Sequence, residues 1–272
     1  MRSARRHGSD ARTRRLGERR SIPFRHQRHA QGFAFLALPE SGILYALSIA
    51  RTGSAMSKRT DIIDGKDAET RNYGLVYTRK CGWIDLGHAN PASARGLWRD
   101  ILATQTACHP SGYSRVVYQQ RMSKFGITAS ASRQYEIKDS LTLADQKAVA
   151  LAIFLDVSIE FERMQSNWFY SMFTDSGFSA EDLVSDLLGF YRAVAPGTQY
   201  VKACEPVSQA DALAIWDRFG PVGSIKNTSP GPYLYTIDPA TGAGSAVCAQ
   251  LPPFLRSIAP AVKGDLFRDV PP

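Results

Sequence analysis

The sequence predicts an α+β fold in which a small antiparallel sheet, carrying a β-hairpin, packs on a long buried helix and two or three shorter helices. Residues 72–102 read as a strand, a tight turn, a second strand and a capped helix. Residues 143–173 have the pattern of one long helix, apolar nearly all round over residues 148–161. Shorter amphipathic segments with helix-start signals follow near residues 180–194 and 209–219.

The positive charge of the chain is confined to its first fifth. The 272 residues carry a formal net charge of +8. Residues 1–55 contain 11 arginines and 3 acidic side chains, and the remaining 217 residues contain 22 basic and 22 acidic side chains. The rest of the chain therefore has no net field that would attract polyanions, and no nucleic-acid partner is expected.

The same boundary divides the chain into two regions. Residues 1–55 are expected to form a disordered, arginine-rich tail followed by an apolar segment, residues 32–50, which is broken by Pro39 and Glu40. A membrane span needs about 20 apolar residues, so no transmembrane span is predicted. Residues 56–272 are expected to form one globular domain, rich in proline and glycine from about residue 221.

Two explanations fit the first 55 residues. They resemble an export signal, with a basic start, a split apolar stretch and small residues before a cleavage point, which would place the protein in the cell envelope or outside the cell. Alternatively, translation starts at Met56 and the protein is cytoplasmic.

Element boundaries follow from local signals. Turn residues 79–82 separate two apolar runs and predict the hairpin, and Asn90 followed by Pro91 begins the helix after it. Strands are expected over residues 113–122, 132–139 and 233–237. Three pairs of a hydroxyl residue and an aspartate three positions later predict helix starts: Thr142 with Asp145, Ser179 with Asp182, and Ser208 with Asp211. Gly220 is expected to end the last of these helices.

The first candidate for chemistry is His88, at the junction of the second hairpin strand and the following helix. Strand alternation puts His88 on the apolar face of Ile84 and Leu86, with Asp85 on the other face. The spacing of Asp85 and His88 resembles a pair of metal ligands, but the two side chains converge only if the strand breaks at Gly87. The alternative is a core histidine satisfied by one hydrogen bond.

The second candidate is a pair of acids in the long helix. Asp156 and Glu160 are one turn apart on the same face of an apolar segment. Burial of a carboxylate is costly unless it is paired or bound to metal, so a partner is expected: His88, Arg163 or a metal ion. A purely structural pairing with an arginine is an equal alternative. In the next helix, Ser185 and Asp186 are not explained by capping.

The four cysteines show no paired spacing, which argues against a zinc ribbon. Buried free thiols are expected, and two disulfides are the alternative if the protein is exported. The cysteines are Cys81, Cys108, Cys204 and Cys248.

The predicted function is a hydrolase with a histidine–carboxylate site. His88, Asp156 and Glu160 are the predicted catalytic residues, and His88, Asp85 and Glu160 are the predicted ligands if the enzyme uses zinc or another divalent metal. The alternative is a non-catalytic, exported binding or structural protein with a buried network of His88 and acids. No phosphate-binding glycine loop, HExxH motif or nucleophile elbow is present.

Two motifs resemble the bacterial family known as domain of unknown function 4056. The first is GLVYT-x-x-x-G-x-I-D-x-x-H, matched by residues 74–88, and the second is FS-x-EDL-x-S-x-LLG, matched by residues 178–189. The chain departs from the pattern at Ala89 and Asn90, where a branched and then a basic residue are expected. The resemblance implies an exported or envelope protein and transfers no settled activity. A third option, separate from the resemblance, is an antibacterial effector that uses the same residues on a cell-wall substrate.

Overall fold

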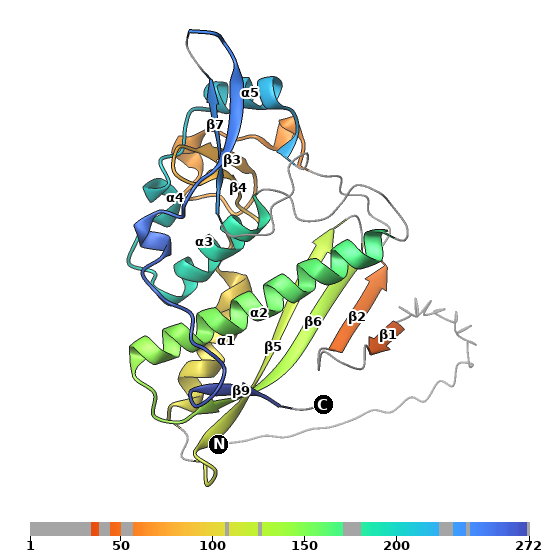
Figure 1. Ribbon diagram of the computed structural model, residues 1–272, viewed down its shortest axis with the longest axis vertical. Helices are drawn as coiled ribbons and strands as arrows, with labels where there is room; N and C mark the ends of the chain where they lie inside the picture. The colour runs from red at the N-terminus through yellow and green to blue at the C-terminus, as the bar shows by residue number, and fades with distance from the viewer. Residues whose placement is uncertain are drawn as a thin grey trace, which may run out of the picture. The chain divides into compact units, whose positions relative to one another are not determined.

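The computed structural model of the protein describes residues 34–37, 44–49, 57–106, 109–124, 127–170, 181–222, 231–237 and 240–270 (Figure 1). Its largest sheet is antiparallel and has five strands, with β6 at the centre. The strands are β1 (Ala34–Ala37), β2 (Leu44–Ile49), β5 (Tyr113–Lys124), β6 (Ile127–Lys138) and β9 (Phe267–Asp269). Along β6, β5 occupies one edge, while β2 and β9 pair with successive stretches of the other. The α+β prediction is confirmed.

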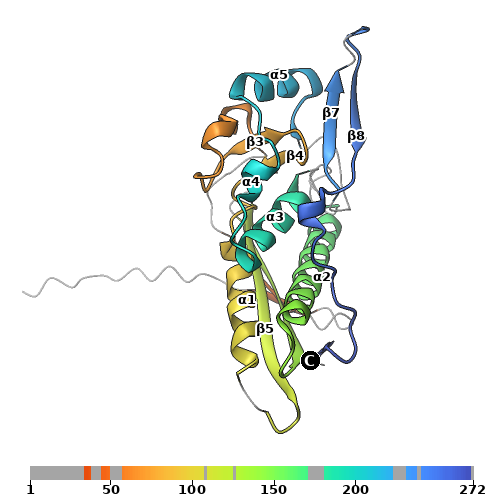
Figure 2. The same ribbon diagram turned by 90° about the vertical axis from the view of Figure 1, so that its left-hand side faces the viewer.

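Two helices pack against this sheet. Helix α2 (Leu143–Tyr170) lies over β5 and β6 (Figure 1), and α1 (Ala92–Thr104) packs against β5 and α2 (Figure 2). On β5, Ser114, Val116 and Tyr118 are buried, whereas Arg115 and Val117 are exposed. This alternation shows that only one side of the strand faces the helices.

The predicted hairpin is formed by β3 (Leu75–Thr78) and β4 (Gly82–Asp85), but it is a separate two-stranded sheet and not part of the large one. Both of its faces are buried. Ile84 packs in the main core, and Trp83 packs edge-on against Trp216 in a second cluster. The predicted alternation is confirmed, and it lets the hairpin lie between two apolar clusters.

The C-terminal half supplies three more helices and a second hairpin. The helices are α3 (Asp182–Val194), α4 (Tyr200–Ala203) and α5 (Gln209–Phe219), and the hairpin strands are β7 (Tyr233–Ile237) and β8 (Gly244–Cys248). Two predicted caps are confirmed, because Thr142 and Ser208 each accept a hydrogen bond from the backbone N–H three residues later. Gly220 ends α5 with a φ of 85°. Ser179, of the third predicted cap, lies outside the described residues.

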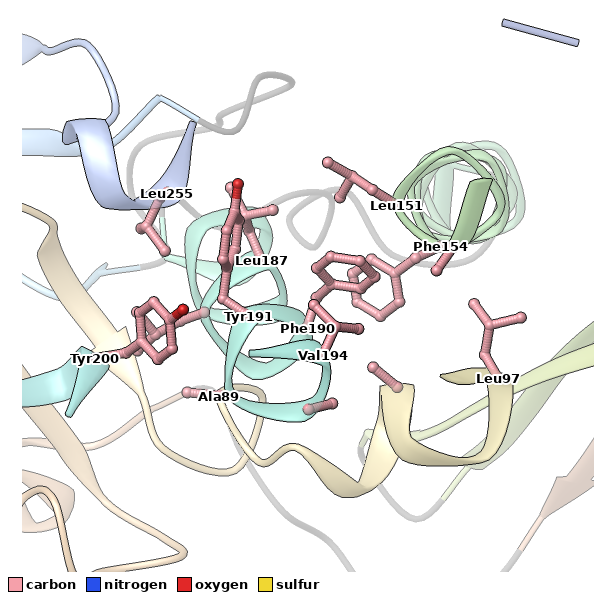
Figure 3. Close-up of a cluster of buried hydrophobic side chains, with 14 of the residues drawn as sticks. Ala89, Leu97, Leu151, Phe154, Leu187, Phe190, Tyr191, Val194, Tyr200 and Leu255 are labelled. Atoms are coloured by element: carbon pink, nitrogen blue, oxygen red, sulfur yellow. The ribbon is translucent and has the colours of Figure 1, made fainter. Parts of the chain in front are cut away.

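Helix α3 is the most enclosed helix among those described. Twelve of its 13 residues are buried, and Arg192 alone is half-buried. Phe190 of α3 stacks against Phe154 of α2 with ring centroids 5.2 Å apart, and Tyr191 packs on Tyr200 (Figure 3). The two aspartates of α3 are therefore carried into the interior by the apolar residues around them.

None of the described helices is both long enough and apolar enough to cross a membrane.

Candidate functional site

His88 lies between two carboxylates of helix α3. Its Nδ1 atom is 3.3 Å from Oδ1 of Asp186, and its Nε2 atom is 3.9 Å from Oδ1 of Asp182. Residues four apart share a helix face, so α3 presents both acids to the ring. The His88 side chain is 20% exposed, whereas those of Asp182 and Asp186 are 4% and 6% exposed. The His88 side chain is therefore partly exposed, whereas its acidic partners are buried.

The turn that carries His88 is fixed to α3 by close backbone contacts. Ser185 Oγ accepts a hydrogen bond from the backbone N–H of Asp85 at 3.0 Å, and Arg192 donates to the Ala89 carbonyl at 2.8 Å. Gly189 faces the same turn, where a Cβ atom would lie 2.9 Å from the carbonyl oxygen of His88. The absence of a side chain at Gly189 allows the helix to approach this closely.

Asp85 lies at the end of the hairpin strand, one turn before His88. Strand β4 ends at this residue, and the Asp85 carboxylate accepts a hydrogen bond from the Gly87 N–H at 2.7 Å. The chain therefore leaves the extended conformation before it reaches His88. The negative charge of Asp85 also contributes to the electrostatic environment of the imidazole.

Three carboxylates favour the protonated ring. Burial alone would lower the pKa of His88, but the hydrogen bond to Asp186 and the charges of Asp182, Asp186 and Asp85 together raise that pKa well above its usual value. Burial raises the pKa of Asp186, and the hydrogen bond to His88 offsets part of this rise. Both directions favour retention of a proton by the pair of His88 and Asp186.

Asp186 keeps one oxygen available. Its Oδ2 atom is buried and has no hydrogen-bond partner in the part of the chain that the structure describes. A buried carboxylate oxygen without a donor is costly. This oxygen is therefore an acceptor next to the His88 ring.

Asp156, predicted as a catalytic partner of His88, is held by a different set of residues. Its carboxylate lies 2.8 Å from the side-chain nitrogens of both Arg133 and Lys263, and it accepts a hydrogen bond from the Tyr135 hydroxyl. The arginine pairing that the sequence allowed is thus present, with Arg133 of β6. The Glu160 side chain lies outside the described part of the structure, so its predicted role stays a prediction.

The two acids beside His88, Asp182 and Asp186, are not among the site residues predicted from the sequence. Asp182 has the position of a capping residue, which explained it without a site, whereas Asp186 had no such explanation. The usable signal was Asp182 and Asp186 one turn apart in an otherwise apolar helix. Among the described side chains, no cluster of three or more His, Cys, Asp or Glu residues has a spacing suited to a metal ion.

A family model described as protein of unknown function (DUF4056) matches residues 52–198, which is more than half of the chain. The chain belongs to the DUF4056 family. The matched region of this DUF4056 protein contains the β3–β4 hairpin, His88 and all of α3. The histidine–aspartate site, made of His88, Asp182 and Asp186, therefore lies within the family domain. No curated protein and no solved structure matches the chain.

Proposed function

We propose that this protein is a hydrolase in which His88 transfers protons to and from the substrate. The observation that supports this proposal is the partly exposed His88 side chain, with a carboxylate facing each ring nitrogen. Histidine is the side chain most often used for proton transfer near neutral pH. A neighbouring carboxylate that fixes the ring orientation is a recurring part of such sites.

The two aspartates would have different roles. Asp186, at 3.3 Å, would accept the Nδ1 proton and orient the ring, which leaves Nε2 as the nitrogen that exchanges a proton with substrate. Asp182, 3.9 Å from Nε2, would stabilise the imidazolium and is the closer carboxylate to the reacting side. With the His88 pKa raised, the ring starts as an acid that donates to a leaving group and then accepts a proton from the attacking water.

A metal-dependent form of the same hydrolase would use His88, Asp85 and Glu160 as ligands. A histidine that holds a carboxylate on one nitrogen commonly binds metal through the other. Metal binding requires a neutral imidazole, so it would have to displace the proton that the carboxylates favour. Elemental analysis of the purified protein, compared with His88→Ala, tests this form. Stoichiometric zinc that disappears in a folded variant supports it.

The test of the hydrolase is a panel of chromogenic esters, amides, glycosides and phosphodiesters, together with bacterial cell-wall fragments. His88→Gln is expected to lower kcat/KM for any accepted substrate by about 100-fold or more. His109→Gln is the matched control, because His109 is exposed on a loop. Hydrolysis that is unchanged in a folded His88→Gln variant would rule out the proposed role.

The second candidate is a non-catalytic, exported binding or structural protein. The burial of Asp182 and Asp186 favours it, because acids that substrate cannot reach can still order the fold. This candidate predicts no turnover on the panel together with a large loss of thermal stability in His88→Gln. The hydrolase predicts loss of turnover with the fold retained.

A further inference from the structure

A second cluster of reactive side chains lies at the tip of the β3–β4 hairpin. The sulfur atoms of Cys81 and Cys204 are 2.8 Å apart, although the residues are 123 positions apart in the chain. Both residues have 0% exposure. Non-bonded carbon atoms are most favourably placed about 3.5–4.0 Å apart, and sulfur is larger than carbon. The two thiols are therefore closer than two unbonded sulfurs would normally be.

The backbone around the two cysteines holds them in register. The N–H of Arg79 donates to the Glu205 carbonyl at 2.9 Å, and the N–H of Lys80 donates to the Cys204 carbonyl at 3.1 Å. The side chains of the neighbouring residues Lys80 and Glu205 form an ion pair of 2.7 Å. The hairpin tip thus runs alongside the end of α4, which holds the two cysteines next to each other.

We propose that Cys81 and Cys204 form an intramolecular disulfide that joins the hairpin to the end of α4. The two thiols lose two protons and two electrons as the S–S bond forms. A disulfide-containing oxidant, such as oxidised glutathione or an oxidised thiol–disulfide oxidoreductase, takes up both electrons and is released as two thiols. The exchange passes through a mixed disulfide with one of the two cysteines.

Burial determines when this exchange can occur. The hydrogen bond to Cys81 and burial raise the pKa of the Cys204 thiol, so little thiolate is present once the chain has folded. The bond is therefore expected to form while the hairpin is still undocked, and the folded protein then shields it from reductants. Cys248 on β8 is exposed and provides the contrasting thiol.

The disulfide would join the hairpin that precedes His88 to α4, the helix that follows the aspartate-bearing α3. The hairpin leads directly into the turn that carries His88, and α4 follows α3, which carries Asp182 and Asp186. A crosslink that closes a loop of this length removes much of the conformational freedom of the unfolded chain. The inference stands independently of the hydrolase, because it rests on the sulfur pair alone.

The test is a mass measurement on the full-length chain refolded with oxidised and reduced glutathione. After denaturation and alkylation without reductant, the protein is expected to retain two unlabelled cysteines, and a non-reduced digest is expected to contain one peptide pair joining Cys81 to Cys204. The same digest of Cys248→Ser should retain that pair, and Cys81→Ser should lack it. Complete alkylation of Cys81 and Cys204 after oxidative refolding, or a crosslink of either to a different cysteine, would overturn the inference.

A stability measurement gives a second readout. Reduction of the wild-type protein is expected to lower its Tm by about 5–15 °C. The Tm of the double variant Cys81→Ala, Cys204→Ala should not respond to the reductant. If the double variant does not fold, the mass measurement on the wild-type chain decides the question alone. The proposal is contradicted if reductant leaves the Tm of the wild-type protein unchanged and alkylation shows that neither Cys81 nor Cys204 was in a disulfide.

Discussion

Nδ1 of His88 lies 3.3 Å from Oδ1 of Asp186, across 98 residues of chain. The hairpin brings the histidine to one side of this contact, and the buried helix α3 brings the aspartate to the other. The ring nitrogen and the carboxylate stabilise each other's charged forms, whereas burial opposes both charges. The protonation of His88 is therefore a direct measure of whether the two elements are docked.

Replacement of Asp186 by asparagine is expected to lower the pKa of His88. The substitution removes a negative charge and a charge-assisted acceptor but keeps the shape of the side chain. A proton NMR titration of the His88 ring would show a midpoint at lower pH than in the wild type. Asp100→Asn is the control, because Asp100 pairs with Arg99 on the surface of α1. An unchanged His88 midpoint in folded Asp186→Asn would contradict the pairing of His88 with Asp186.

The stability of the protein is expected to fall as the pH rises above neutrality. His88 has a raised pKa in the folded state, so its contribution is complete below its unfolded value of 6.5 and is lost as the pH rises through the folded pKa. The pKa of Asp186 is also raised, so its contribution to stability is likewise lost as the pH rises, but at lower pH, from its unfolded value of 3.8 upward. Urea unfolding between pH 6 and pH 9 measures this loss. His109→Gln is the control. If the free energy of unfolding of His88→Gln depends on pH as strongly as that of His109→Gln, the effect comes from other groups.

Ser185→Ala is expected to destabilise the protein by about 1–3 kcal/mol, because it leaves the partly buried N–H of Asp85 without its acceptor. The variant should also weaken the attachment of the His88 turn to α3, which a change in the His88 NMR shift would reveal. Ser257→Ala is a suitable control, since Ser257 is exposed and its hydroxyl donates to the nearby Phe254 carbonyl. Equal unfolding free energies for the two variants would show that the Ser185 contact is not needed.

Local signals in the sequence were sufficient to predict most of the fold. Strand alternation in residues 83–86 and the hydroxyl–aspartate pairs at Thr142 and Ser208 depend on neighbours within a few residues, and the structure confirms them. The pairing of strands is different, because it depends on distant parts of the chain. Nothing near the hairpin indicates that Ile62 and Pro206 flank it, and so its separation from the large sheet could not be predicted.

Only part of the site could be predicted from the sequence, because the contacts of His88 also depend on distant parts of the chain. His88 was identified because it stands at the end of an apolar strand, a local feature. Its partners required knowledge of which helix approaches the turn, and the acids of α2 and α3 are equivalent candidates by composition. The close approach depends on Gly189, whose packing role has no signature in a single sequence. Tertiary contacts determine which of the two helices supplies the acidic partners of His88.

Asp156→Asn is expected to reduce stability without changing the titration of His88. The carboxylate joins Arg133, Lys263 and Tyr135, and its removal leaves a partly buried guanidinium with Asp269 as its remaining acidic partner. Loss of a hydrogen bond to a charged group costs about 1.5–3 kcal/mol. Urea unfolding gives the stability, and the NMR titration gives the His88 pKa. A shift of that pKa would instead support the catalytic role predicted for Asp156 from the sequence.

Gly189→Ala is expected to separate helix propensity from the close approach of α3 to the His88 turn. Alanine in a helix is favoured over glycine by roughly 0.5–1 kcal/mol, whereas overpacking a filled contact costs about 1–3 kcal/mol. At Gly189 the added Cβ would meet the carbonyl oxygens of His88 and Asn90 at 2.9 and 3.1 Å, so the cost is expected to exceed the gain. At Gly96 of α1, no atom lies within 4 Å of the added Cβ, and Gly96→Ala is therefore expected to stabilise the protein.

The two glycine substitutions are expected to change the free energy of unfolding in opposite directions, so each is a control for the other. Urea unfolding should give a lower free energy of unfolding for Gly189→Ala than for the wild type, and a higher one for Gly96→Ala. Because the clash at Gly189 pushes α3 away from the turn, the His88 pKa should also fall in Gly189→Ala alone, as the ring loses its aspartate partners. Two glycine variants with the same gain in stability and the same His88 pKa would mean that α3 does not pack against the turn as closely as the structure shows.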